Sequence, residues 1–330
     1  MKKFLSIAVA FVAAVVMIGT NAGLAEAQSR GLGITPRRDL TVQPGKSVTD
    51  KVTVTNLNGT EDLALTLNIT DFGAKDETGT PSLQLDESKA QTPWSLKPFI
   101  DAPESVIVKP NESKTVEYKV SIPSNQGAGS YYSAIRYVAE AEDGGQVAIG
   151  ASGATLVFVT VPGKTKESLI VDKFGAYATN KYQSVFIKTS PNEMAYTLKN
   201  QGNVAEQPAG SIEIKNMFGK RADIVEDANP KASLALREQT RRFQVCIQGQ
   251  KSEETVACKE TSYMPGRYTA TLNAFYGING NQTQEILTTA SFWYLPVWFL
   301  IVLGVVVLAV ASTVYIIYRR ITGRHGFKKR

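Results

Sequence analysis

Hydrophobic and polar residues alternate along most of the chain between residues 30 and 291. The clearest runs are Val48–Val54, Leu63–Ile69, Val116–Ile122 and Tyr268–Tyr276. Short alternating runs, separated by turns that contain Gly, Pro or Asn, are typical of antiparallel strands with one buried face. Helical periodicity is nearly absent from the same region. The pattern therefore predicts an all-β fold made of sandwiches.

The length of this alternating region, about 260 residues, indicates two domains. An apolar run that ends at Val161 gives way to a polar stretch with Pro and Gly, which suits a linker. The two halves also repeat a feature, because a strand ends in Asn56 and another in Asn200, each followed closely by a Gly-containing turn. We therefore expect two tandem immunoglobulin-like β-sandwich domains, residues 28–163 and 164–291.

The C-terminal part of the chain follows a different pattern. No charged residue interrupts Pro296–Ile317, which is long enough for an α-helix to cross the hydrocarbon core of a bilayer. The residues after it include six basic and no acidic ones, and basic flanks stay on the cytoplasmic side of a membrane. We expect a single transmembrane α-helix at 292–318 and a basic cytoplasmic tail at 319–330. Trp293 and Tyr294 would lie at the membrane boundary.

The N-terminus has the layout of a secretory signal. Two lysines precede the apolar run Phe4–Ile18, and Ala25-Glu26-Ala27 resembles an A-x-A cleavage site. We expect residues 1–27 to be a cleaved signal peptide. The alternative is a retained signal anchor, which would leave both ends of the chain in the cytoplasm. In either case the bulk of the chain is extracellular and the C-terminus is cytoplasmic.

The positive charge of the chain comes from these membrane flanks. The sequence has 36 basic and 30 acidic residues, with a pI near 9.1. Six basic residues follow Tyr318, and the first 27 residues hold two basic and one acidic residue. The exported region is left with 28 basic and 29 acidic residues, a formal charge of −1. A nearly neutral region lacks the excess of positive charge that binds nucleic acid, which excludes DNA and RNA as partners.

The two cysteines of the chain, Cys246 and Cys258, both lie in the exported region. An even pair in an oxidising compartment is most simply a disulfide. Closing the short polar loop between them would contribute roughly 2–3 kcal/mol on the entropic model. Two free thiols are the alternative.

Catalytic and metal-binding motifs are missing from the exported region. The single histidine, His325, falls in the expected tail, which excludes a Ser-His-Asp triad, a Cys-His pair and a His-ligated zinc ion. Four acidic residues surround a Gly-bearing stretch without matching an EF-hand, so we expect a solvated loop there: Asp71, Asp76, Glu77 and Asp86. We therefore expect no catalytic residue, no metal and no cofactor. An envelope hydrolase that uses Asp and Glu stays open, because carboxylate distances are invisible in a sequence.

Large aromatic residues are the candidates for ligand contact. Trp94, Tyr131 and Tyr132 lie in the first half, the two tyrosines directly after the loop 127–130. Aromatic side chains in strands usually serve packing, which is the other interpretation. We take Trp94, Tyr131 and Tyr132 as possible binding residues.

Three stretches of the first half carry a family resemblance. They are Ile34–Asn56 with its Pro44-Gly45 turn, Thr92-Pro93-Trp94 with Val106–Pro110, and Ile122–Ile135. Together with the order of leader, two sandwiches, membrane helix and basic tail, they resemble the WxL-interacting protein family of bacterial cell-surface proteins. The resemblance implies binding to cell-wall peptidoglycan and to partner surface proteins that end in Trp-x-Leu modules.

The leading hypothesis is a non-enzymatic, single-pass cell-surface protein that binds cell-wall glycan, partner surface proteins, or both. Rigid sandwiches present loops and sheet edges for recognition, and a membrane tether raises the local concentration of the binding region. We expect the first sandwich to carry this binding. The alternatives are the Asp/Glu hydrolase and an ectodomain subunit of a membrane complex, since so short a tail would need a partner subunit to signal.

Overall fold

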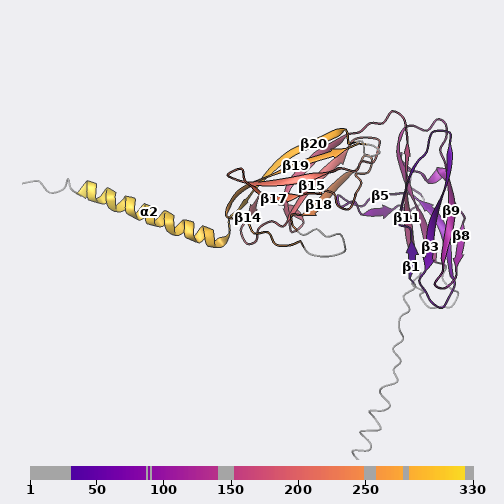
Figure 1. Cartoon of the computed structure of the whole chain (residues 1–330), viewed down its shortest axis with the longest axis horizontal. Coiled ribbons are helices and arrows are strands. Elements are labelled where there is room, and N and C mark those ends of the chain that lie inside the picture. Colours follow the sequence, from indigo (N-terminus) through magenta and orange to yellow (C-terminus); the bar gives the residue numbers. More distant parts are fainter. Residues whose placement is uncertain are drawn as a thin grey trace, which may run out of the picture.

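The computed structural model describes residues 31–86, 88–89, 91–139, 152–248, 258–277 and 282–323. The expected signal peptide, His325 and most of the loop between the cysteines lie outside the described residues. Within them the chain forms two β-sandwiches in sequence order, followed by one long helix (Figure 1).

The first sandwich packs a four-stranded sheet against a five-stranded sheet. The order β1-β3-β9-β7 in the smaller sheet joins Leu32–Ile34, Ser47–Asn56, Ser113–Ser121 and Ile100–Asp101. The order β2-β11-β10-β4-β8 in the larger sheet joins Arg37–Thr41, Ser152–Val161, Gly129–Ala139, Leu63–Thr70 and Ser105–Val108. A short hairpin, β5 (Phe72–Ala74) and β6 (Pro81–Leu83), and a 3-10 helix, η1 (Lys97–Phe99), complete this half.

The second sandwich repeats this plan. The order β13-β12-β15-β18 joins Lys181–Tyr182, Leu169–Ala178, Glu193–Asn200 and Thr240–Cys246. The order β14-β20-β19-β16-β17 joins Val185–Phe186, Gln284–Tyr294, Gly266–Tyr276, Ala209–Asn216 and Arg221–Val225. In both sandwiches one strand pairs in parallel, β2 with β11 and β14 with β20, while the other ladders are antiparallel.

Alternation along the strands explains the two cores. In β9 the side chains of Val116, Tyr118 and Val120 are buried, and those between them are exposed. Strand β10 departs from this pattern because both of its faces are covered. Ile135 lies in the core of the first sandwich, whereas Tyr132 points the other way and is covered by residues of the second sandwich. Burial on both faces of β10 therefore marks where the two sandwiches meet.

Asn56 and Asn200 occupy equivalent places in the two sandwiches. Each is buried at the end of a strand, and its side-chain oxygen accepts from the N–H two residues further on, at 2.9 and 2.8 Å respectively. Each side-chain NH₂ group donates to two backbone carbonyls, those of Glu61 and Val108 for Asn56, and those of Val204 and Ala235 for Asn200. A buried amide with all these partners ties a turn to a neighbouring segment, which explains why the Asn-turn signal repeats.

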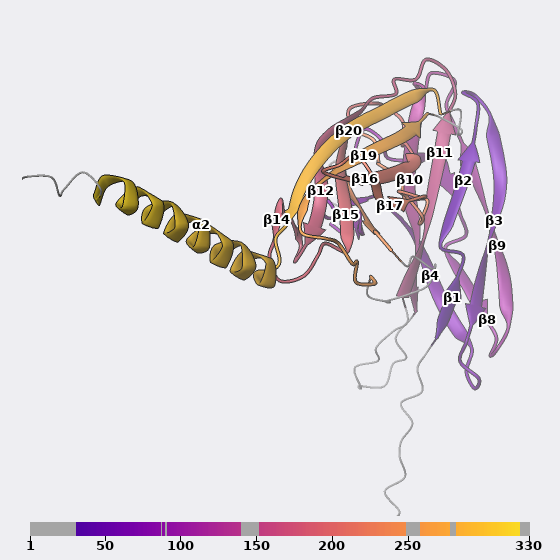
Figure 2. The ribbon, with the colours of Figure 1, turned by 60° about the vertical axis from the view of Figure 1, so that its left-hand side comes forward.

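The two sandwiches lie side by side (Figure 1 and Figure 2). Apolar and polar contacts form a junction between them. Its apolar part joins Phe72 and Tyr132 of the first sandwich to Leu236 of the second. Its polar part centres on Gln239, whose Nε2 donates to Tyr132 Oη at 3.0 Å and whose Oε1 accepts from the Ala74 N–H at 2.8 Å. The hairpin β5–β6 is thus fastened to the second sandwich.

The first residues of β10 add a second set of bonds across the junction. The Ser130 N–H donates to the Asn203 carbonyl at 2.9 Å, and Ser130 Oγ accepts from the Ala205 N–H at 2.8 Å. Gly129 has a φ of 149°, and a Cβ there would lie 2.6 Å from the Asn203 carbonyl oxygen. Only glycine fits this close approach of two backbones.

The long helix α2, Val297–Gly323, projects away from the second sandwich (Figure 1), and residues 300–322 are exposed. Its segment Val297–Thr322 has a mean hydropathy of 2.8 and is long and apolar enough to span a membrane. It begins later than expected, because Trp293 and Tyr294 still pair within β20. The predicted fold class, two immunoglobulin-like sandwiches followed by one apolar helix, is confirmed.

Candidate binding site

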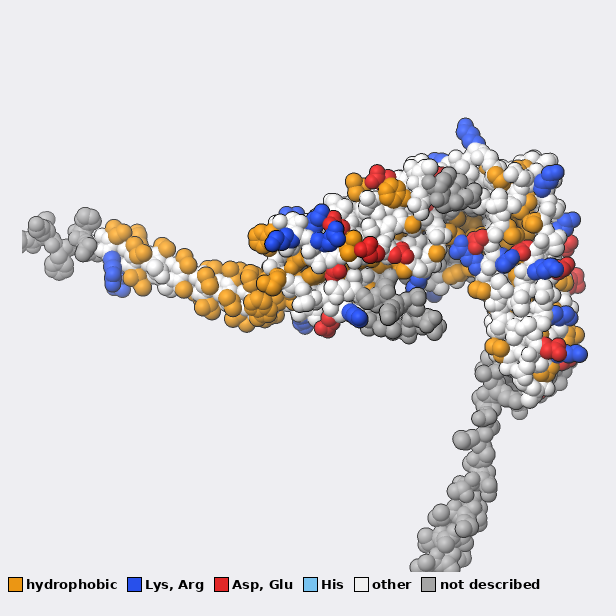
Figure 3. Space-filling view, in the orientation of Figure 1, with side chains coloured by type: hydrophobic (Ala, Val, Ile, Leu, Met, Phe, Trp, Pro, Cys, Tyr) orange, Lys and Arg blue, Asp and Glu red, His pale blue; other side chains and the backbone are white. Residues whose placement is uncertain are grey.

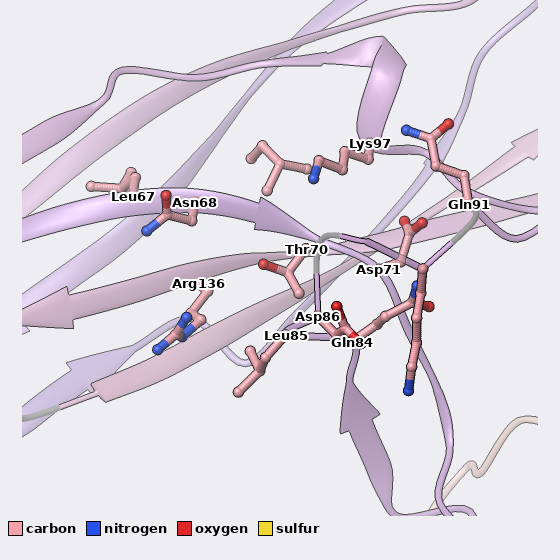
Figure 4. A pocket seen from close by; sticks show the side chains of 12 residues that line it. Leu67, Asn68, Thr70, Asp71, Gln84, Leu85, Asp86, Gln91, Lys97 and Arg136 are labelled. Atoms are coloured by element: carbon pink, nitrogen blue, oxygen red, sulfur yellow. The ribbon is translucent and has the colours of Figure 1, made fainter.

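A polar hollow of about 570 Å³ opens on the outer face of the larger sheet of the first sandwich (Figure 4). Three parts of the chain line it: the end of β4 with Asp71, residues 84–86, 89 and 91 after the hairpin, and single side chains from η1 and β10. Its polar lining residues include Asn68, Thr70, Gln84, Gln91, Lys97 and Arg136.

Strand alternation points two of these side chains into the hollow. Asn68 of β4 and Arg136 of β10 are directly paired across the sheet, so their side chains are neighbours on one face, with Cβ atoms about 5 Å apart. Leu67, next to Asn68, is buried in the core, which fixes the outward direction of Asn68. Lys97 reaches the hollow from η1 (Figure 4). A rigid sheet therefore forms the floor of the site.

Asp71 fixes the wall of the hollow from inside. This residue is buried, and its Oδ1 accepts hydrogen bonds from Ser95 Oγ at 2.7 Å and from Ser133 Oγ at 2.8 Å. Its backbone carbonyl accepts from the Gln84 N–H at 2.7 Å. The expectation of a solvated loop is therefore wrong for Asp71, whose carboxylate joins three segments, whereas Asp76 and Asp86 are exposed.

The charge of the hollow is unbalanced. Within the described ranges, neither Lys97 nor Arg136 has a carboxylate within 4 Å. Asp86 accepts from the Ser88 N–H and Oγ at 3.1 and 2.6 Å, and these bonds hold the pKa of Asp86 below its ordinary value. The cations Lys97 and Arg136, the amide groups of Asn68 and Gln91 and the Thr70 hydroxyl are thus left for a ligand, while a third lining cation, Lys89, contributes to lowering the pKa of Asp86. Such a set suits a hydrophilic ligand that carries carboxylate or other anionic groups.

The two carboxylates of the hollow are not prepared for acid catalysis. A general acid for glycoside cleavage needs a raised pKa, whereas that of Asp86 is lowered and Asp71 is committed to two serine hydroxyls. In the described part of the chain, a raised carboxyl pKa occurs at Glu206, which is only 1% exposed and lies in the second sandwich. No cluster of three or more His, Cys, Asp or Glu among the described residues could hold a metal ion.

The structure places the three aromatic residues predicted for binding at or beside the junction. Tyr132 is buried there, with its ring centroid 5.0 Å from that of Phe72 and 6.1 Å from that of Trp94. Tyr131 points the other way, into the core of the first sandwich, and its hydroxyl donates to the Gly127 carbonyl at 2.9 Å. Both tyrosines have their ring faces covered, and Trp94 is half-buried. A binding role for the three residues stays a prediction.

Cys246 and Cys258 form the predicted disulfide, with their Cα atoms 5.3 Å apart. It joins the end of β18 to the segment that leads into β19. This bond lies in the second sandwich and takes no part in the hollow.

Sequence reasoning missed Asn68, Lys97 and Arg136. Asn68 and Arg136 carried a usable signal, because each is a polar residue at an outward position of an alternating strand. Nothing in the sequence indicated that the two strands are neighbours, and Lys97 belongs to a segment without periodicity.

No family model and no curated protein matches the sequence. Among solved structures, the class 5 fimbriae chaperone CfaA matches with a TM-score of 0.36 and 12% identity, over 78% of this chain and 98% of the chaperone. The E. coli chaperone DraB matches with a TM-score of 0.34 and 9% identity, over 78% and 96%. The PapD-like domain 7 of human CEP192 matches with a TM-score of 0.29 and 14% identity, over 43% and 92%. These likenesses concern the fold alone.

Proposed function

We propose that this chain is a non-enzymatic, membrane-anchored cell-surface protein whose first sandwich binds anionic cell-wall glycan. The observation that carries the proposal is the polar hollow, in which Lys97 and Arg136 have no carboxylate within 4 Å among the described residues. Wall peptidoglycan presents hydroxyl, amide and carboxylate groups, and these are the partners that such a lining recognises. Partner surface proteins with exposed acidic segments are the second candidate ligand, and the same cations would serve them.

Anchoring by α2, with the sandwiches outside, is part of the same proposal. It is supported by the length and apolarity of Val297–Thr322 and by the basic residues that follow Tyr318. We also propose membership of the WxL-interacting protein family, on the strength of the three sequence stretches described above.

Binding of the full-length protein to purified wall sacculi tests the proposal. Because charge-assisted hydrogen bonds contribute roughly 1.5–3 kcal/mol each, losing one should weaken binding about tenfold or more. Reconstituted in nanodiscs, the double variant Lys97→Glu/Arg136→Glu should therefore be retained far less than the wild type. Lys119→Glu, at an exposed position on the opposite sheet, is the control for the change in charge.

Three outcomes would contradict this assignment. Equal retention of the double variant and the wild type would exclude the hollow as the glycan site. Loss of binding to envelope proteins, with sacculus binding unchanged, would make a surface protein the ligand. Release of soluble wall fragments by the purified protein, abolished by Asp71→Asn or Asp86→Asn, would favour the hydrolase instead.

A further inference from the structure

The end of the second sandwich that faces α2 is held close to the helix. Strand β20 ends at Tyr294 and the helix begins at Val297. Three residues span at most about 10 Å. We call this the helix-proximal end of the second sandwich. Any membrane that α2 crosses would therefore begin within a short distance of this end.

The turn between β16 and β17 lies at the helix-proximal end and exposes two large apolar side chains. Met217 is 52% exposed and Phe218 is 80% exposed. They occupy the two central positions of a tight turn closed by a bond from the Gly219 N–H to the Asn216 carbonyl at 2.9 Å. Such positions usually hold Gly, Asn, Asp or Pro. The fold of the sandwich therefore gives no reason for a phenylalanine at position 218.

The turn is rigidly built. Asn216 Oδ1 accepts from the N–H groups of Phe218 and Lys220, both at 3.0 Å, and Gly219 takes a φ of 76°. The Met217 side chain lies directly over Gly266, the first residue of β19. These contacts hold Phe218 outward without burying it.

The strand register places Phe218 level with the end of β20. Asn216 pairs with Tyr268, and Gly266 pairs with Tyr294. Continuing the first pairing by two residues puts Phe218 opposite Gly266, and so at the height of Tyr294. Because β19 separates β16 from β20, the lateral distance is about 10 Å, two strand spacings. Phe218 thus stands beside the point where the chain leaves the sandwich for the helix.

An exposed apolar residue also lies on the other side of β20. Phe186 of β14 pairs in parallel with Tyr294, so Ile187 continues one residue beyond it toward the helix. The Leu295 N–H donates to the Phe186 carbonyl at 2.8 Å, which keeps β14 beside the chain at this point. Ile187 is 46% exposed. Apolar side chains therefore flank the start of the helix on two sides.

Basic residues surround these apolar ones. Lys188, Lys220 and Arg267 are exposed at the helix-proximal end, and within the described residues none of them has a carboxylate within 4 Å. Figure 3 shows apolar and basic side chains together at the end of the sandwich beside the helix. Exposed apolar groups next to cations are the composition that binds the headgroup region of a bilayer with anionic lipids.

We propose that Met217, Phe218 and Ile187 insert into the headgroup–acyl boundary of the membrane, so that the second sandwich rests on the bilayer surface. This inference rests on the proposed anchoring by α2. This contact fixes the orientation of the second sandwich relative to the membrane. Because the junction joins the two sandwiches, it also fixes the orientation of the first sandwich. Lys188, Lys220 and Arg267 then lie at the height of the lipid headgroups.

Quenching by nitroxide-labelled lipids tests this inference in the full-length protein. Phe218→Cys, labelled with a fluorophore and reconstituted in phosphatidylcholine–phosphatidylglycerol liposomes, should be quenched strongly by a nitroxide near the headgroup. Because Cys246 and Cys258 are joined in the disulfide, the label reacts with the new thiol. Ile107→Cys, at a position 56% exposed in the first sandwich, is the matched control and should be quenched several-fold less.

Leu308→Cys, in the middle of α2, separates this inference from the anchoring proposal. Quenching at 308 by a deep nitroxide, with position 218 no more quenched than 107, would overturn the inference and leave the anchor standing. No quenching at 308 would overturn both. Lys220→Glu in the Phe218→Cys background should lower quenching at 218 when the liposomes contain phosphatidylglycerol. Unchanged quenching would contradict the role of the cations.

Discussion

Glu206 gives the sharpest quantitative prediction, because its carboxyl group is buried without compensation. Among the described residues neither carboxylate oxygen has a hydrogen-bond partner, and the residue is 1% exposed. Burial, with a smaller contribution from the negative charge of Glu167, raises the pKa of Glu206 from 4.5 to about 8. The backbone N–H of Gly277, which is nearby but does not form a hydrogen bond of normal geometry, lowers the pKa by a smaller amount. At neutral pH the folded protein therefore holds a proton that the unfolded chain has released.

The sign of the pH dependence follows from this difference. Below about pH 4.5 the carboxyl is protonated in both states, so it has no effect on the free energy of unfolding. Between pH 4.5 and about 8 only the folded state binds the proton, so stability falls as the pH rises. Over that interval the loss reaches roughly 5 kcal/mol, at 1.36 kcal/mol per pKa unit. Above the folded pKa the loss is complete and stays constant.

Glu206→Gln removes the titrating proton and keeps the shape of the side chain. Near pH 5 the variant and the wild type should unfold at similar temperatures, and near pH 9 the variant should be more stable. A gain of roughly 5 kcal/mol in the free energy of unfolding corresponds to an increase of roughly 10–20 °C in melting temperature. Thermal unfolding of the full-length protein from pH 5 to 9 measures the difference, with Glu226→Gln, at an exposed position, as control. A variant that is less stable than the wild type at pH 9 would refute the reasoning, since the native carboxylate would then be ionised and paired.

Three further predictions concern stability and topology. Replacing Cys246 and Cys258 by Ser should lower the free energy of unfolding by roughly 3 kcal/mol in denaturant titrations, and alkylation of native thiols would contradict the disulfide. Gly129→Ala should lower the free energy of unfolding by about 1–3 kcal/mol and make the linker after Val161 cleavable by trypsin. Gly127→Ala should do neither, because a Cβ there would meet its nearest neighbour at 3.8 Å. Protease added to intact cells should remove both sandwiches and leave a small membrane fragment. Protection of the sandwiches would exclude the proposed orientation.

The sequence was sufficient for features that depend on local pattern. Alternation identified β3, β4, β9 and β19, since each has one face in a core and one in solvent. Unbroken apolarity identified the helix, and the repeated Asn-turn signal reflects the same buried amide at Asn56 and Asn200. Both ends of the helix were displaced. It begins after β20 because Trp293 and Tyr294 suit a strand end as well as a membrane interface, and it continues to Gly323, past the expected end at 318.

Features that depend on distant contacts were beyond the sequence. Tyr132 and Gln239 are 107 positions apart, and nothing local shows that they meet across the junction. The outer side of β10 is buried at Tyr132 and Ala134 by this junction. Because the sequence does not show the junction, Tyr132 resembled an aromatic residue available to a ligand. The hollow depends on which strands are neighbours, and its wall depends on Asp71 reaching Ser95 and Ser133. A cluster of acidic residues in a sequence cannot distinguish an internal anchor of this kind from a solvated loop.

The direct passage from β20 into α2 has a mechanical consequence. The first sandwich and the helix leave the second sandwich on opposite sides (Figure 1), so tension between a wall ligand and the membrane would run along β20. Strand β20 lies between β14 and β19, and its ladder with β19 extends over its whole length. Load applied along the strand strains these hydrogen bonds together instead of opening them one at a time. A tether fastened through a strand loaded in this way should therefore hold under forces that would peel a strand away one hydrogen bond at a time.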